Sequence, residues 1–116
     1  RGSFGVDGPG FEGHILAELL KHGFPVRYWR TMSKAEVDFV VDVGPHLIAV
    51  EAKMGDPKPS RSLRSFMNKY APTRAYVVTM RANEPRSDRG VIQVNPLDLI
   101  GQLDELKRSS ETVTTS

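Results

Sequence analysis

The sequence predicts one small α/β domain built around a hairpin of two early strands. A chain of 116 residues has room for one core of ordinary size and not for two. Segments with helical spacing alternate with short apolar runs, and Gly44-Pro45 separates two of these runs at a tight turn. The expected order of elements is α-β-β-β-α-β-β-α, with a mixed central sheet flanked by helices.

The elements of the first half follow from periodicity and turn residues. The first ten residues contain four glycines and one proline, which indicates a loop. Apolar residues recur with helical spacing from Phe11 to His22, and Gly23 then stops the helix. Strands are expected at Val26–Thr31, Ala35–Val43 and His46–Lys53.

The second half begins with a helix after a loop rich in Gly and Pro. Its apolar residues stand at positions i, i+3, i+4 and i+7 and are Leu63, Phe66, Met67 and Tyr70. Ala75–Met80 is a continuous apolar run, typical of a strand covered on both faces. Arg81–Gly90 is expected to be a polar loop, and Val91–Val94 a short strand.

A last helix is expected to be capped by Asn95 and to start at Pro96. Its apolar stripe consists of Leu97, Ile100, Leu103 and Leu106. From Ser109 onward the chain is rich in Ser and Thr and is expected to be disordered. The folded domain is therefore expected over residues 11–107, between a flexible segment at 1–10 and a disordered tail at 108–116.

The composition excludes several classes of chemistry. The chain has no cysteine, so it forms no disulfide, thiolate zinc site, iron–sulfur cluster or cysteine nucleophile. No stretch approaches the roughly 18 apolar residues that a membrane span needs, and no signal-peptide pattern opens the chain. These features suit a soluble cytoplasmic protein. Because Arg1 stands where Met would start a complete protein, the first residues are expected to be a cloning remnant or the chain a fragment of a larger protein.

Charge is distributed unevenly along the chain. Residues 36–52 contain four acids and no Lys or Arg, whereas residues 53–89 contain nine bases and three acids, a balance of +6. This pattern fits a cation site beside a track for a polyanion, and it equally fits an ordinary solvated surface.

Glu12 occupies an unusual position in the first predicted helix. On a helical wheel it falls in the middle of the apolar stripe that contains Phe11, Ile15 and Leu19. A carboxylate that points into a core needs a partner, a proton or a metal ion. The alternative is that Glu12 lies in the first helical turn, where the helix dipole favours acids.

The predicted hairpin brings two further acids together. With Gly44-Pro45 at the turn, paired residue numbers sum to 89, so Asp38 faces Glu51 and Glu36 faces Lys53. Like charges placed opposite each other destabilise a sheet, and a divalent cation would turn this repulsion into coordination. The alternative is a solvated strand face with a Glu36–Lys53 pair.

These residues resemble a known family. Asp38 on one strand and Glu51-Ala52-Lys53 on the next resemble the PD-(D/E)xK signature of restriction-endonuclease-like nucleases. The chain from about Gly10 to about Leu99 looks most like the nuclease-like C-terminal domain of prokaryotic AAA-type ATPases. The matching segments are Phe11-Glu12, Tyr28–Thr31, Glu36–Val40 and Ser62–Phe66. The departures are Val37, where the signature has proline, and the absence of an ATPase half.

The resemblance implies a restriction-endonuclease-like core and a role for each matching residue. Asp38, Glu51 and the Ala52 backbone carbonyl would bind Mg²⁺ or Mn²⁺, with Glu12 as an outer or second-metal ligand. Lys53 would orient or help to deprotonate the attacking water and offset charge in the transition state.

Other polar residues are supporting candidates. Arg30 would contact phosphate or pair with Glu36. The candidate nucleic-acid contacts are Lys58, Arg61, Arg64 and Lys69, whose alternative use is to keep a helix soluble.

The sequence is compatible with two functions. The first is a Mg²⁺-dependent phosphodiesterase domain acting on DNA, for which double-strand cutting would usually imply a homodimer. The second is a catalytically silent module of the same fold, used by the ATPase domain of its parent protein for docking or nucleic-acid binding. A Rossmann-like or phosphate-loop enzyme is excluded because no glycine fingerprint stands between a strand and a helix.

Overall fold

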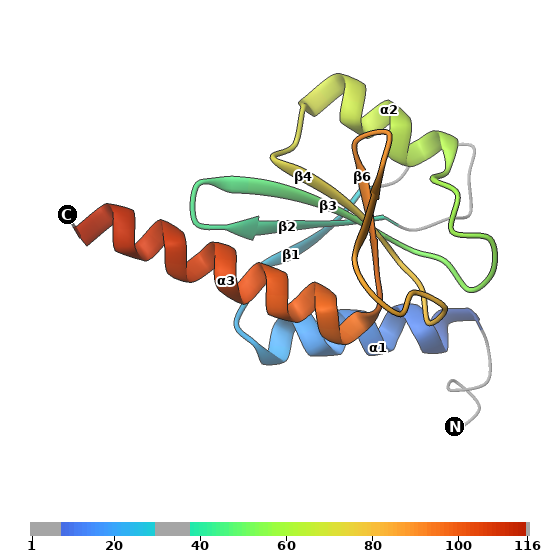
Figure 1. The fold of residues 1–116 in the computed structure, drawn as a ribbon, viewed down its shortest axis with the longest axis horizontal. Helices are drawn as coiled ribbons and strands as arrows, with labels where there is room; N and C mark the ends of the chain where they lie inside the picture. Colours follow the sequence, from blue (N-terminus) through green and yellow to red (C-terminus); the bar gives the residue numbers. More distant parts are fainter. Residues whose placement is uncertain (1–7, 30–37, 116) are drawn as a thin grey trace.

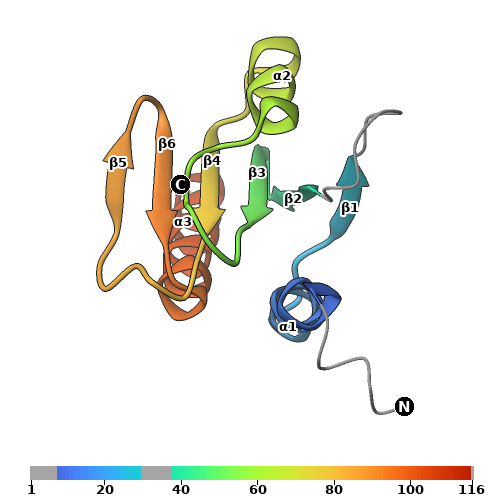
Figure 2. The same ribbon diagram turned by 90° about the vertical axis from the view of Figure 1, so that its right-hand side faces the viewer.

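The computed structural model describes the backbone of residues 8–29 and 38–115 and the side chains of residues 10–28 and 39–111. This part of the chain folds into a mixed sheet of six strands with three helices, which confirms the α/β class. One helix covers one face of the sheet and the other two cover the opposite face (Figures 1 and 2).

The strands lie in the order β1-β2-β3-β4-β6-β5. The first half of the chain contributes α1 (Gly8–Lys21), β1 (Val26–Trp29), β2 (Asp38–Val43) and β3 (His46–Ala52). The second half contributes α2 (Arg61–Tyr70), β4 (Arg74–Val78), β5 (Arg86–Asp88), β6 (Val91–Val94) and α3 (Pro96–Thr115). The pairs β3–β4 and β4–β6 are parallel, and the other pairs are antiparallel.

Helix α1 starts earlier than the sequence indicates. It begins at Gly8, so residues 8–10 belong to the helix and not to the predicted N-terminal loop. Proline in the first turn lacks only an N–H group that would have no helical partner there, so Pro9 does not oppose this start. The helix buries Ile15 and Leu19 against the sheet, and Gly23 ends it with a φ of 84°.

The β2–β3 hairpin has the predicted register. Val43 pairs with His46 and Asp38 pairs with Glu51 on either side of the Gly44-Pro45 turn. Gly44 has a φ of 60°, and a Cβ atom there would lie 3.4 Å from the Cβ atom of Ser110 on α3. The backbone angle favours glycine at this turn, whereas a side chain there would meet α3 only in ordinary van der Waals contact.

Strand alternation divides the core into two clusters. The face under α1 and α3, called here the α1–α3 face, buries Phe39, Val41, Ile48, Val50 and their neighbours. The opposite face, called the α2 face, buries a smaller cluster that contains Val40, Ala49, Leu63, Phe66 and Val77. The predicted strand at Ala75–Met80 corresponds to β4, in which Ala75 to Val78 are all buried, as expected for a central strand.

Strand β5 was not predicted. It lies inside the segment 81–90 that the sequence indicates as a polar loop, and all three of its residues are exposed. It forms the sheet edge by pairing with β6 through a turn in which Arg89 and Gly90 have φ values of 54° and 83°. Two consecutive positive φ values are typical of a type I′ hairpin turn.

Helix α3 starts as predicted and ends later. The N–H group of Asp98 donates to Asn95 Oδ1 at 2.8 Å, which confirms Asn95 as the cap. The helix continues to Thr115, so the prediction of a disordered tail from Ser109 is wrong over these residues. The predicted apolar stripe also needs correction, because Leu97 is 84% exposed while Leu99, Ile100 and Leu103 are buried. No helix in the part of the chain described by the structure is long and apolar enough to cross a membrane.

Candidate metal and nucleic-acid site

The predicted site residues gather at one end of the molecule. The start of α1, the end of β3 and the start of α2 all lie at the end drawn on the right of Figure 1, which faces the viewer in Figure 2. Among the predicted residues, Arg30 and Glu36 lie outside the described residues, and so does the side chain of Asp38.

Asp38 and Glu51 occupy directly opposite backbone positions on β2 and β3. This pairing confirms the predicted register on which the metal hypothesis depends. The same row continues across the sheet, because Glu51 is level with Val77 on β4 and Val77 is level with Gln93 on β6. Residues level with one another share one face, so Glu51 and Gln93 are on the α2 face with Val77.

Glu51 is a buried acid. Its side chain is only 1% exposed, which is unusual for a carboxylate because desolvation of the charge costs several kcal/mol unless partners offset it. The Oε1 atom accepts a hydrogen bond at 2.9 Å from the backbone N–H group of Ser60. Glu51 therefore ties the end of β3 to the loop that leads into α2.

Ser60 connects this acid to the start of α2. It is the N-cap residue, with φ −76° and ψ 166°, and its hydroxyl accepts from the N–H group of Leu63 at 3.1 Å. The side chain of Ser60 thus caps the helix while its backbone holds Glu51. Sequence reasoning missed this contact, although Ser60 immediately before an apolar helical pattern is a recognisable cap signal.

Lys53 follows β3 at the same end. Its backbone N–H group donates to the Val78 carbonyl at 2.9 Å, so the ladder with β4 continues one residue beyond the strand. Ala52 packs against the cluster of the α1–α3 face, so alternation puts Lys53 on the α2 face with Glu51. The Glu51-Ala52-Lys53 segment therefore presents its two charged residues to one side of the sheet.

Glu12 comes from the other side of the sheet. It is half-buried near the start of α1, which packs on the α1–α3 face. Within the residues whose side chains are described, no three of His, Asp and Glu come together in an arrangement that could hold a metal ion. The structure thus brings Glu12 to the same end of the molecule as Glu51, and Asp38 opposite Glu51, without defining a complete ligand set.

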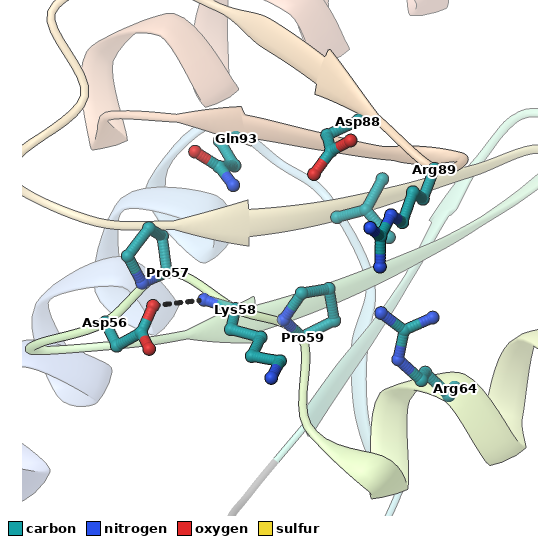
Figure 3. A pocket seen from close by; sticks show the side chains of 9 residues that line it. Asp56, Pro57, Lys58, Pro59, Arg64, Asp88, Arg89 and Gln93 are labelled. Carbon is teal, nitrogen blue, oxygen red and sulfur yellow. Dashed lines mark hydrogen bonds between the residues drawn. The ribbon is translucent and has the colours of Figure 1, made fainter.

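The predicted nucleic-acid contacts divide into two groups. Lys58, Arg61, Arg64 and Lys69 are all exposed. Lys58 and Arg64 line a cavity of about 340 Å³ between the loop before α2 and the β5–β6 hairpin, together with Arg89 (Figure 3). Arg61 is on the same helix but not in this cavity, and Lys69 lies 5.4 Å from the Tyr70 ring centroid in the last turn.

Comparison with known proteins identifies the family. A family model described as Domain of unknown function (DUF4143) matches residues 7–100, which is most of the chain. The chain belongs to the DUF4143 family. DUF4143 is a domain found in AAA-ATPase-associated proteins. No curated protein and no solved structure gives a significant match to this DUF4143 chain.

Proposed function

We propose that this DUF4143 domain is a Mg²⁺-dependent phosphodiesterase of the restriction-endonuclease-like fold that cleaves DNA. The observation that carries the proposal is the position of Glu51, a carboxylate only 1% exposed and directly opposite Asp38 in the sheet. Directly opposed residues have Cβ atoms roughly 4.5–5.5 Å apart, and two carboxylates at this spacing repel each other. A shared divalent cation offsets both the repulsion and the desolvation of Glu51.

The donor atoms near Glu51 suit Mg²⁺ or Mn²⁺, since both prefer oxygen ligands. Asp38, Glu51 and the Ala52 carbonyl would hold the ion, and Glu12 would complete the set from α1. When bound, the metal supplies a more acidic water and neutralises charge on the phosphate oxygens.

The chain's own contribution to cleavage centres on Lys53. Strand alternation puts Lys53 on the same face as Glu51, which supports a role in which its ammonium group would orient the attacking water and offset charge gained by the phosphate oxygens. The exposed bases of α2 and of the preceding loop would hold the DNA backbone through phosphate contacts. A larger parent protein with an AAA-type ATPase domain is consistent with the family.

The proposal is tested by incubating the protein with supercoiled plasmid and branched DNA in Mg²⁺ and in Mn²⁺. We expect wild-type cleavage in either metal, and its loss in Asp38→Asn, Glu51→Gln and Lys53→Met. Asp42→Asn is the matched control for Asp38→Asn, because both residues are on β2. Asp42 forms an ion pair with Arg27 at 3.0 Å. Folded wild-type protein that cuts no DNA form in either metal would contradict the proposal.

A second candidate is a non-cutting module of the same fold that docks an ATPase domain or nucleic acid. The observation in its favour is the hydrogen bond from Ser60 to Glu51, which gives the buried acid a structural task without any metal. Titration with Mn²⁺ separates the two functions. A catalytic site takes up Mn²⁺ with an affinity that Glu51→Gln removes, whereas a docking module shows no Glu51-dependent uptake.

A further inference from the structure

The cavity between the loop 56–59, helix α2 and the β5–β6 hairpin combines three cationic side chains. Lys58 comes from the loop, Arg64 from α2 and Arg89 from the hairpin turn. Figure 3 shows the guanidinium groups of Arg64 and Arg89 pointing toward one another across the cavity. Three segments that are separate in sequence thus each contribute one basic residue to the lining of one space of about 340 Å³.

The three cations of the cavity differ from Arg27, which pairs with Asp42. Within the described side chains, none of Lys58, Arg64 and Arg89 forms an ion pair. Asp56 and Asp88 also line the cavity, but one Asp56 oxygen already accepts from the N–H group of Lys58 at 3.1 Å. Three basic and two acidic residues line the cavity, a formal balance of +1, and the two guanidinium groups that face each other favour an anion between them.

The backbone conformation at Arg89 supports a functional role for this arginine. Its φ of 54° lies in the left-handed region, where Gly, Asn or Asp is the usual residue of a type I′ turn. Arginine gains nothing from this conformation and is disfavoured in it. The turn therefore places a long cationic side chain at the cavity although its backbone conformation is unfavourable for arginine.

The cavity lies beside the candidate catalytic residues. Gln93 lines it and shares the sheet row of Glu51, two strands away. Neighbouring strands are about 4.8 Å apart, so the two Cα atoms are separated by roughly 10 Å. The loop that supplies Lys58 also starts directly after Lys53.

We propose that this cavity binds a backbone phosphate of the nucleic-acid strand, next to the phosphate at the candidate catalytic residues. Arg64 and Arg89 hold the phosphate oxygens as a pair of guanidinium clamps, and Lys58 adds a third charge. The proposal rests on the proposed function for the identity of the ligand, and it adds Arg89 as a contact that charge patterning alone does not reveal.

The test measures binding in the absence of metal. A fluorescently labelled single-stranded oligonucleotide is titrated with protein in EDTA, so that Glu51 and Asp38 contribute no metal-dependent affinity. We expect Arg89→Asn and Arg64→Gln to weaken binding at least fivefold and to lower the slope of log K against log salt by about 0.7. Asp88→Asn removes a negative charge from the same cavity and is expected to tighten binding severalfold.

Two features keep the test specific. Asn suits the left-handed turn better than Arg, so Arg89→Asn is expected to fold with at least the wild-type melting temperature. Lys21→Gln makes the same change in net charge on the exposed surface of α1, on the other side of the sheet, and is expected to change affinity less than twofold. An Arg89→Asn affinity within twofold of wild type would overturn the proposal.

Failure of the cavity and failure of the catalytic proposal give different results. Cleavage of DNA by the wild type in Mg²⁺, with wild-type oligonucleotide affinity and KM in Arg89→Asn, would contradict the cavity proposal and support the nuclease proposal. Oligonucleotide binding that depends on Arg89, without cleavage in any metal, would support the cavity proposal and contradict the nuclease proposal. Arg89-dependent binding of inorganic pyrophosphate without any oligonucleotide binding would overturn the assignment to nucleic acid.

Discussion

The two faces of the central sheet differ in the helices that cover them and in the side chains that they bury. The α1–α3 face is sealed by two helices over a continuous apolar cluster that runs from Ile15 to Leu103. The α2 face is covered by one helix of ten residues over a smaller cluster. Within the described side chains, the buried polar or charged ones are Glu51, Ser62 and Thr79.

All three of these side chains lie on the α2 side. Ser62 is on α2 itself, and strand alternation places Glu51 and Thr79 on the same face as Val77. The candidate site and the basic cavity are on this side too. The difference indicates that the α1–α3 face supplies most of the stability, while the α2 face buries a smaller apolar cluster together with these three polar side chains.

The largest effect is expected on the α1–α3 face. Leu103→Ala removes a fully buried side chain from α3 and is expected to lower the free energy of unfolding by about 3 kcal/mol, measured by urea denaturation. Leu97→Ala is the control on the same helix, because Leu97 is 84% exposed, and should change stability by less than about 0.5 kcal/mol. Equal effects of the two substitutions would show that α3 packs through a different face.

The opposite sign is expected at Glu51. Glu51→Gln keeps an acceptor for the Ser60 N–H group and removes the like-charge repulsion with Asp38 on the opposite strand, so metal-free protein should gain about 1 kcal/mol of stability at neutral pH. Loss of stability by more than that amount would mean that the charge itself holds the start of α2, and the comparison of the two faces would fail.

The cap of α2 offers a test of similar size. Ser60→Ala removes the hydroxyl that accepts from Leu63 and is expected to cost about 1 kcal/mol. Ser65→Ala, at an exposed position of the same helix, should be neutral or slightly stabilising because Ala favours helices. The same urea series measures both variants, and matching losses would argue against a specific cap.

The smallest effect concerns pH and the Tyr76 hydroxyl. Burial raises the pKa of Tyr76 above its ordinary value of 10.0, and the nearby Arg74 opposes this shift. The folded chain therefore keeps the Tyr76 proton to higher pH than the unfolded chain, so the free energy of unfolding should fall as the pH rises above about 10. Tyr76→Phe should flatten this fall, and an unchanged slope would contradict the assignment.

Much of the fold can be predicted because local signals and burial agree. The Gly44-Pro45 turn and the strand alternation together allow only one register for the β2–β3 hairpin. The continuous apolar run of β4 indicates a central strand, and Asn95 followed by Pro96 marks the start of α3. Each of these signals lies within a few residues of the feature that it specifies.

The remaining elements depend on contacts that periodicity does not encode. Strand β5 has no apolar residue and exists through its pairing with β6. The last turns of α3 carry Ser and Thr rather than an apolar stripe, although Ser110 lies against the hairpin turn at Gly44. The hydrogen bond from Ser60 to Glu51 could not be predicted either, because the path of the loop from Lys53 to Ser60 determines it.

The most direct measurement is a crystal structure of the wild-type chain soaked in Mn²⁺ and recorded at the manganese absorption edge. We expect an anomalous peak within coordination distance of one carboxylate oxygen of Asp38 and one of Glu51. Well-ordered Asp38 and Glu51 side chains with no peak between them at saturating Mn²⁺ would contradict a shared cation and leave the α2 face without a catalytic centre.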